Sequence, residues 1–424
     1  MTPHSRSRQD RRHRDWSEVP AVRYRRPFLL LLASLSLTKL GDLIASPKTT
    51  LAWLASAVGA PGWVLGYLVP IRESGAMVPQ LLVGGWIRSR PRRKWVWVAG
   101  GLLQGACVAG LAWVALALSG VTAGWAMLGL VACFSLARCL CSVAVKDVIG
   151  KTVAQQRRGQ LSGWAGSVAG LLSVAVGATV ALAPSEQWDG AILALLLLGA
   201  AGLWWLSSLL FAAIPEQAGE MERERGMVRS LASMSLLRTD RYFRRFVIAR
   251  ALLMGSALSA PFYVALAQGA AGGGLAVLGG VLVAAGVASL FSGALWGCFA
   301  DRSTRGVMTI AGVLTFGVGL GTFAASRFAP ALIEGAWFVP AAYFLLSVAH
   351  EGVRVGRATH VVNLGEGNRR TDYVAISNSV IGVLLLLVGS VGALTPWLGN
   401  DGVIGLLALM SLAGALMSRT LADV

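Results

Sequence analysis

The sequence predicts an all-α membrane protein whose twelve transmembrane helices form two six-helix, pseudo-symmetric halves. The mean hydropathy is +0.66, and 55% of the residues are hydrophobic while only 13% are charged, which lies outside the range of soluble domains. Roughly twelve apolar runs are each long enough to cross a bilayer, which takes about 20 residues. Short polar fragments also recur at an offset of 212 residues, which is half of the 424-residue chain.

Each apolar run is expected to be a helix, because a spanning segment must satisfy its own backbone hydrogen bonds in the absence of water. The predicted spans are 28–53, 62–86, 95–118, 122–145, 161–183, 190–213, 246–267, 275–299, 307–326, 337–360, 373–395 and 402–418. The first and the tenth runs contain charged residues, and Pro47 predicts a kink near the end of the first.

The recurring fragments lie at or beside the ends of the apolar runs. A glycine followed by a polar residue and arginines occurs twice, as Gly85, Ser89, Arg90 and Arg93 and as Gly297, Asp301, Arg302 and Arg305. Two copies of a membrane unit in one chain are typical of carriers, in which the substrate path lies between the copies.

The net charge of +17 is concentrated in alternate connections between the spans. Basic residues gather in the tail before residue 27, in 88–94, at 151–158, across 223–245, at 302–305 and at 369–370. The other connections contain acidic residues, with Arg327 as their one cation. Because basic loops are retained in the cytoplasm, both termini are expected there, in a multi-pass protein of the cell inner membrane.

The predicted organisation is a basic cytoplasmic tail (1–26), an N-terminal half (27–213), a cytoplasmic linker (214–245), a C-terminal half (246–418) and a cytoplasmic C-terminus (419–424). The tail and the first run could be mistaken for a secretory signal, but the run is too long and contains charges, so we expect no cleavage. The five cysteines fall inside apolar runs at spacings that match neither a disulfide framework nor a zinc site. No metal and no cofactor are expected.

The loop at 85–94 (GWIRSRPRRK) resembles the signature loop of the major facilitator superfamily, G-x-x-x-D-R-x-G-R-R. The second copy, GCFADRSTR at 297–305, falls between spans eight and nine, where that family repeats the loop. The resemblance covers about residues 27–418 and implies a bacterial transporter of this superfamily, of no assigned subfamily. It also implies that the two loops gate the cytoplasmic side, through Gly85, Arg90, Arg93, Gly297, Asp301, Arg302 and Arg305.

The first loop departs from the family pattern. Ser89 occupies the position of the acidic residue, and Arg92 replaces the glycine. The resemblance therefore leaves Asp301 as the one acid able to make the contact between halves that the family's loop makes. The motifs of drug–proton antiporters in span five and of sugar porters after span six are missing, beyond Pro215 and Glu216.

Ionisable residues within the spans are functional candidates, because a charge in the bilayer costs several kcal/mol unless it faces a wet cavity or a partner. Span one contains Lys39 and Asp42 on one helix face. Span two contains Arg72 and Glu73 near its midpoint, with Gln80 on the same face as Glu73. Interhelical salt bridges are the alternative role for these groups.

Spans four and ten carry matching stripes of polar residues. Arg138 lies in span four, and His350, Glu351 and Arg354 lie in span ten. Arg138 plus the offset of 212 gives His350. In the resembled family, spans one, four, seven and ten line the central cavity, which would place these side chains in a substrate or ion pathway.

The sequence thus favours a secondary active transporter that works by alternating access, and not an enzyme. No phosphate-binding G-x-x-x-x-G-K-[ST] loop is present to use ATP. Expected partners are a small-molecule substrate, anionic or polar, the lipid bilayer, and protons carried by Asp42 and Glu73, with no nucleic acid and a monomeric state. The alternatives are a membrane-embedded enzyme, which would need clustered carboxylates or histidines, and a non-transporting sensor or assembly factor on the same scaffold.

Overall fold

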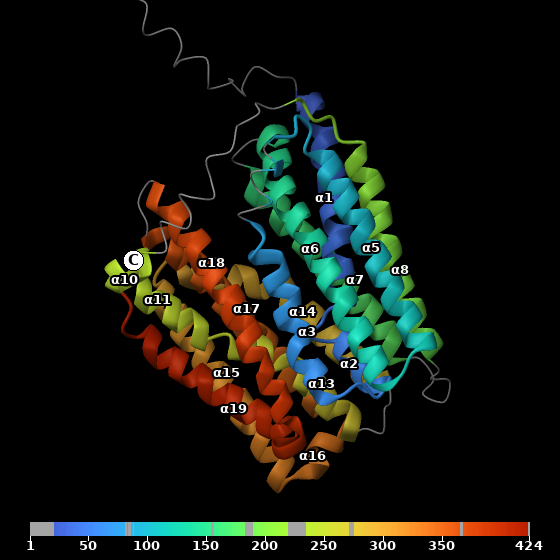
Figure 1. The fold of residues 1–424 in the computed structure, drawn as a ribbon, viewed down its shortest axis with the longest axis vertical. Coiled ribbons are helices and arrows are strands. Elements are labelled where there is room, and N and C mark those ends of the chain that lie inside the picture. The colour runs from blue at the N-terminus through green and yellow to red at the C-terminus, as the bar shows by residue number, and fades with distance from the viewer. Residues whose placement is uncertain are drawn as a thin grey trace, which may run out of the picture.

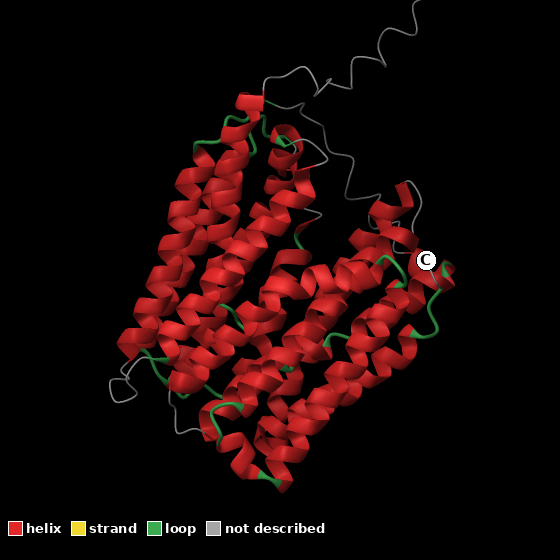
Figure 2. Ribbon diagram, turned by 180° about the vertical axis from the view of Figure 1, so that it is seen from behind, coloured by secondary structure: helices red, strands yellow, loops and turns green. Residues whose placement is uncertain are grey.

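The computed structural model describes residues 21–80, 83, 86–87, 89–153, 157–182, 190–218, 235–270, 275–364 and 368–422. Throughout these residues the secondary structure is helical, with short turns and no strands (Figure 2). The helices form two lobes that correspond to the two halves of the sequence (Figure 1).

The N-terminal lobe contains α1 (Ala21–Ile44), α2 (Thr50–Ala57), α3 (Gly62–Met77), α5 (Lys94–Ala117), α6 (Gly120–Thr152), α7 (Arg158–Ala181) and α8 (Gly190–Ala212). The C-terminal lobe contains α10 (Leu236–Thr239), α11 (Arg241–Leu252), α12 (Gly255–Leu258), α13 (Ala260–Ala270), α14 (Leu275–Ala300), α15 (Thr304–Phe328), α16 (Pro330–Glu334), α17 (Phe338–Leu364), α18 (Asn368–Gly389), the 3₁₀ helix η5 (Ser390–Leu394) and α19 (Thr395–Ser418).

Nine stretches of the described chain are long and apolar enough to cross a membrane. One of them, Ile376–Ser418, runs from α18 through α19 and so covers two of the predicted spans. The helices α3 and α17, predicted as spans two and ten, are not among the nine. Both carry charged residues in mid-helix, which lowers their hydropathy.

Several helix boundaries differ from the predicted spans, and two of them fall inside segments predicted as tail or linker. The first helix begins at Ala21, inside the predicted tail, and the seventh span begins at Arg241, inside the predicted linker. Asp240 explains the second difference, because its Oδ1 accepts the Phe243 amide at 3.0 Å and so caps α11. Most of the predicted linker, residues 219–234, lies outside the described residues.

Spans one and seven are both interrupted, at corresponding places in the repeat. The first breaks between α1 and α2 over residues 45–49, which contain Pro47. The seventh is divided into α11, α12 and α13 between residues 252 and 260. The offset of 212 maps 45–49 onto 257–261, so the sequence repeat extends to these breaks. Interrupted helices at matching positions of two repeats expose backbone groups near the centre of a carrier.

The lobes meet at one end and separate at the other. They diverge toward the end where α1 begins, and they converge where α2 and α13 lie (Figures 1 and 2). We call the diverging end, which carries Arg93, Lys151, Arg158 and Arg302, the basic end, and the other the closed end. The hydrophobic core follows this division, because one cluster combines residues of both lobes. Each lobe has a separate cluster of its own toward the basic end.

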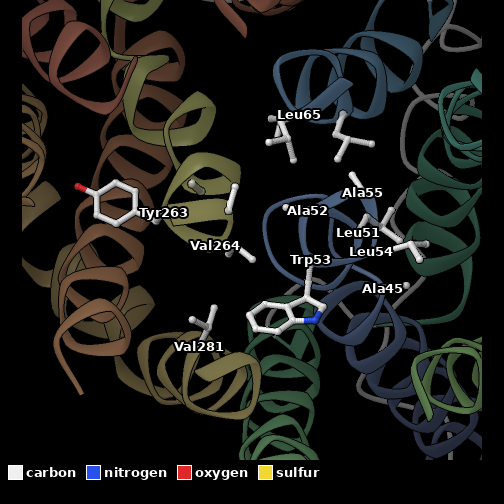
Figure 3. Packing of buried hydrophobic residues seen from close by; sticks show 14 of the residues in the cluster. Ala45, Leu51, Ala52, Trp53, Leu54, Ala55, Leu65, Tyr263, Val264 and Val281 are labelled. Carbon is white, nitrogen blue, oxygen red and sulfur yellow. The ribbon is translucent and has the colours of Figure 1, made fainter. Parts of the chain in front are cut away.

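The shared cluster brings α2 and α3 against α13 and α14. Trp53 on α2 is 1% exposed and points toward Val264 on α13 and Val281 on α14 (Figure 3). Tyr263 on α13 is fully buried in the same cluster. These contacts join the lobes through side chains that neither lobe could bury alone.

Glycines allow the backbones of the two lobes to touch at the closed end. A Cβ atom on Gly66 of α3 would lie 2.4 Å from the Gly389 carbonyl oxygen and 2.7 Å from the Gly392 Cα. A Cβ on Gly279 of α14 would lie 2.3 Å from the Ala181 amide nitrogen. Toward the basic end, a Cβ on Gly297 would have no neighbour within 4 Å. The closest packing between the lobes is therefore at the closed end.

The outer surface is strongly apolar. Large exposed side chains include Trp113, Trp125, Leu195, Leu209 and Leu387, with exposed fractions between 59% and 68%. Such a surface would aggregate in water and is suited to contact with lipid. Together with the apolar helices, it describes a multi-pass membrane protein.

Candidate functional site

Asp42 joins three helices of the N-terminal lobe near the break in span one. Its Oδ1 accepts a hydrogen bond from Arg72 of α3 at 2.7 Å, and its Oδ2 accepts one from Arg138 of α6 at 2.6 Å. The Arg72 guanidinium also lies 4.3 Å from the centre of the Phe134 ring. One carboxylate thus neutralises one of two guanidinium charges, and the group keeps a net charge of about +1.

Glu73 follows Arg72 in sequence but does not pair with it. Consecutive residues on a helix point in different directions, and it is Arg72 that contacts Asp42. Among the described residues Glu73 forms no hydrogen bond and no ion pair. The charges that act on Glu73 are cations. Lys48, Arg72 and Arg138 belong to its own lobe, and Arg357 belongs to the other. Glu73 is therefore an unpaired carboxylate surrounded by positive groups.

A hydrogen-bonded chain crosses between the lobes at the break in span one. The Lys48 ammonium lies 2.8 Å from Nε2 of His350 on α17, and Nδ1 of His350 lies 3.1 Å from the Ser256 hydroxyl. The Tyr343 hydroxyl donates to the Lys48 carbonyl at 3.2 Å. Because an ammonium can only donate, His350 accepts through Nε2, which requires a neutral imidazole with its proton on Nδ1. Lys48 was not among the sequence-predicted site residues.

The remaining charges of α17 fall into two kinds. Glu351 and Arg354 form an ion pair one helical turn apart, and the Arg354 side chain is 61% exposed. Arg357, one turn further toward the basic end, has no hydrogen bond or ion pair with any described residue. Its strongest electrostatic interaction is with Glu73 of the opposite lobe. From its position near the cytoplasmic interface, the sequence favours a structural ion pair for Arg357.

Arg250 lies on α11, near the inner end of span seven, where the sequence favours a structural ion pair at the cytoplasmic interface. It is only 6% exposed, and its terminal nitrogens donate to the Ser377 hydroxyl at 2.7 Å and the Asn378 side-chain oxygen at 2.8 Å. Its Nε has no partner. Both partners are neutral, so within the described residues this buried guanidinium has no counter-ion in direct contact.

Two predicted pathway residues lie somewhat apart from these groups. Lys39 donates to the carbonyl oxygen of Ser162 on α7 at 2.7 Å. It is three residues from Asp42, yet no ion pair joins them in this conformation. Gln80 donates to the Ala76 carbonyl at 2.8 Å and to the Ser142 hydroxyl at 3.3 Å, which ties α3 to α6.

The first loop is built into a charge network of the N-terminal lobe. Arg93 forms an ion pair with Asp147 of α6, and Lys151 bridges Asp147 at 2.6 Å and Glu216 at 3.0 Å. The Glu216 carboxylate also accepts the backbone amides of Arg93 and Lys94, at 3.1 and 2.7 Å, where α5 begins. An acid at a helix N-terminus is favoured by the unpaired amides and the helix dipole.

This network lies within the N-terminal lobe, so it does not supply the contact between the halves for which the first loop lacks an acid. From the sequence, Glu216 was noted only as the remnant of another motif. Arg90 lies over the Trp86 ring at 4.9 Å. Gly85 lies outside the described residues.

The second loop is organised differently. Asp301 and Arg302 are exposed where α14 ends, and Ser303 caps α15 by accepting the Gly306 amide at 3.0 Å. Arg305 lies in the first turn of α15, and Gly297 is one turn before the end of α14. Neither Asp301 nor Arg302 has a described partner in the other lobe, in keeping with separation of the lobes at the basic end.

Within the described residues, no group of three or more His, Cys, Asp or Glu side chains is placed to hold a metal ion. A pocket of about 230 Å³ lies at the closed end of the C-terminal lobe, lined by Leu266, Pro330, Ile333 and Asn400 among others. It includes none of the charged residues described above. The candidate site is thus the charged region between the lobes.

The chain was compared with known proteins. No protein-family model matches it, and no curated protein sequence does. It is similar in structure to a D-xylose–proton symporter (TM-score 0.70, 13% identity, 93% of this chain and 98% of that one).

It is likewise similar to the inward-open xylose transporter XylE from E. coli (TM-score 0.69, 13% identity, covering 93% and 96%). The nucleoside transporter NupG gives a TM-score of 0.70 at 14% identity, covering 92% and 99%. The major facilitator superfamily proton:xylose symporter XylE, bound to 6-bromo-6-deoxy-D-glucose, matches over 96% of this chain at a TM-score of 0.59 and 15% identity. The chain therefore has the fold of the major facilitator superfamily transporters.

Proposed function

We propose that this protein is a secondary active transporter that moves a small solute across the cell inner membrane by alternating access. The observation that carries the proposal is the division of the core. One hydrophobic cluster joins the lobes at the closed end, while each lobe has its own cluster toward the basic end. Charged side chains lie between the lobes, where Arg138 and Arg354 are 32% and 61% exposed.

The basic end faces the cytoplasm in this proposal. Its connections carry the cations that are retained on the cytoplasmic side of a membrane. Both termini would then be cytoplasmic, and the conformation described here would be open to the inside. Transport requires the opposite state as well, in which the basic ends close and the shared core at the closed end separates.

The two gating loops would act in that second state. Asp301 and Arg302 are exposed here, and they would pair with the facing lobe when the basic ends come together. The network of Arg93, Asp147 and Glu216 would keep the first loop rigid throughout. We expect Asp301→Asn to slow transport and to leave substrate affinity nearly intact.

The coupling ion in this proposal is the proton, carried by Asp42 and Glu73. Glu73 is the stronger candidate, because Asp42 is already held by two guanidinium groups. The clustered cations Arg72, Arg138 and Arg354 support an anionic or polar substrate. His350 and Glu351 border the same region. Xylose, nucleosides and peptides are named for the structural neighbours, and their spread of chemistry assigns no substrate to this chain.

The test uses purified protein in sealed vesicles with an internal pH dye. Substrate-driven proton movement is expected in the wild type. Glu73→Gln should abolish that movement and preserve substrate exchange across the membrane, because exchange needs no net proton cycle. Proton movement that continues in both Glu73→Gln and Asp42→Asn, each stably folded, would remove the carboxylate mechanism. Absence of transport for every solute tested would instead favour a sensor on the same scaffold.

A further inference from the structure

Three cations contributed by both lobes act electrostatically on one carboxylate, and within the described residues none of them forms an ion pair with it. Lys48 comes from the break in span one, Glu73 from α3, Arg250 from α11 and Arg357 from α17. Glu73 interacts electrostatically with all three cations, yet it forms an ion pair with none of them. The group draws on both lobes and does not include the Asp42, Arg72 and Arg138 triad.

The cations of this group have only neutral partners in direct contact. Lys48 donates to the neutral imidazole of His350, and Arg250 donates to Ser377 and Asn378. Arg250 is 6% exposed and keeps an unpartnered Nε. A buried guanidinium without an acid is costly, because the desolvation of its charge is not offset. The site therefore has a deficit of negative charge that a ligand can supply.

We propose that Lys48, Arg250 and Arg357 form an anion subsite in which the substrate's carboxylate or phosphate group replaces Glu73 as counter-ion. This proposal rests on the proposed transport function and names its substrate class. With Glu73 ionised the four groups sum to a charge of about +2. A dianion bound to three cations and a protonated Glu73 lowers that sum to about +1, so the subsite favours anions of charge −2, such as phosphate monoesters and dicarboxylates.

The exchange couples substrate to protons. In the empty carrier, ionised Glu73 supplies the negative charge of the cluster. When the anion arrives, two like charges compete for the same cations, and Glu73 takes up a proton from solution. Among the described residues, the charges that act on Glu73 are cations: Lys48, Arg72, Arg138, Arg250, Arg354 and Arg357. The nearby acid Glu351 acts on Lys48 and Arg357 and is itself paired with Arg354. One proton therefore moves with each anion.

The proposed subsite predicts that Glu73→Gln increases the affinity for the anion rather than lowering it. If Glu73 contacted the substrate as a ligand, Glu73→Gln would weaken binding. In the proposed subsite the same change removes a competitor, so it should tighten anion binding by about tenfold or more. A unit charge several Å away inside a protein supplies at least the ~1.4 kcal/mol that tenfold requires.

The experiment measures thermal stabilisation and proton uptake of the purified protein in detergent. The probes are inorganic phosphate, glucose 6-phosphate and malate, with glucose and uridine as neutral comparisons. At least one of the three anions should raise the melting temperature of the wild type and draw protons from a weakly buffered solution. Comparing phosphate with malate shows whether the subsite prefers a phosphate group or a carboxylate group.

Four variants decide the outcome. Glu73→Gln should bind the anion more tightly and take up no proton. Arg357→Gln should lose most of the binding, and Arg357→Lys should restore part of it. Arg419→Gln, which removes an equal charge at the exposed end of α19, should bind as the wild type does. If Arg357→Gln folds poorly, Arg357→Lys still tests the role of this position in anion binding.

Several results would overturn the subsite: stabilisation by the neutral solutes alone, no response to any of the three anions, weaker anion binding in Glu73→Gln, or wild-type binding in Arg357→Gln. The proposed transport function fails separately. Vesicle uptake of a neutral solute without anion binding would refute the subsite and leave the transporter standing. Anion binding without transport of any solute would leave the subsite standing and refute the transport function.

Discussion

Adding a methyl group at Gly66 should push the lobes apart at the closed end. The new Cβ would lie 2.4 Å from the Gly389 carbonyl oxygen, 2.7 Å from the Gly392 Cα and 2.9 Å from the Gly392 amide nitrogen. All three are backbone atoms, so no flexible side chain can yield. Ordinary contacts of carbon atoms lie near 3.5 Å or beyond, so α3 must move from η5 and the end of α18 by roughly 1 Å.

The energy of this clash sets the size of the effect. Overpacking a close contact costs about 1–3 kcal/mol. This cost destabilises only the state in which the two lobes touch at the closed end. The equilibrium between the two states should therefore shift by about 5- to 150-fold toward the state with the closed end open. Gly66→Ala also raises helix propensity, by about 1 kcal/mol, which acts in both states and needs a control.

Gly199→Ala supplies the control. Gly199 lies in the middle of α8, is exposed, and would place its Cβ with no neighbour within 4 Å. The assay is the distance between spin labels at Val121 and Trp337, exposed side chains of the two lobes at the closed end. We expect a longer-distance population in Gly66→Ala only. Identical distance distributions in both variants would show that glycine contact does not hold this end shut.

Three further predictions follow from other contacts. Asp42→Asn should lower stability by about 1–3 kcal/mol, because it strands two guanidinium groups that are partly buried, and removal of Arg138 in the same chain should recover part of the loss; melting temperatures in detergent test both. Glu216→Gln should lower the melting temperature through loss of its bond to Lys151 and weaker acceptance of two amides at the start of α5, whereas an unchanged value would mean that the network adds nothing to stability. Cysteines at Leu182 and Phe328, both 85% exposed at the closed end, should react with an impermeant reagent from outside intact cells, in a background without native cysteines, while a cysteine at Arg302 should not; the reverse pattern would invert the proposed topology.

The helices were predictable because apolar runs report spanning segments directly. Every predicted run contains a described helix, and the charges in α3 and α17 marked the helices that face the interior. The break in span one was indicated by Pro47. The breaks in span seven were not predicted, because Gly255 and Ser259 are common inside apolar helices and carry no distinctive signal.

The pairing of charges could not be predicted in the same way. Sequence placed Asp42, Arg72 and Glu73 at similar depths, but the rotation of each helix decides which acid meets which base. The sequence left open whether Arg72 and Arg138 pair with Asp42 or with Glu73, and the structure pairs both with Asp42. Contacts between halves, such as Lys48 with His350, depend on how the lobes dock, which no local pattern encodes. Glu216 was passed over because its partners at the start of α5 are over a hundred residues away.

The division of the hydrophobic core has a consequence for how the chain assembles. Each lobe buries its own cluster toward the basic end from residues of one half alone, so each half holds enough internal packing to form as a separate unit. The shared cluster can form only after both halves exist, since Trp53 of the first half needs Val264 and Val281 of the second. Two separately synthesised fragments, divided between residues 218 and 235, should therefore recognise each other through this cluster and restore the complete fold. In the proposed transport cycle, the surface that must open is thus the same surface that brings the two halves together.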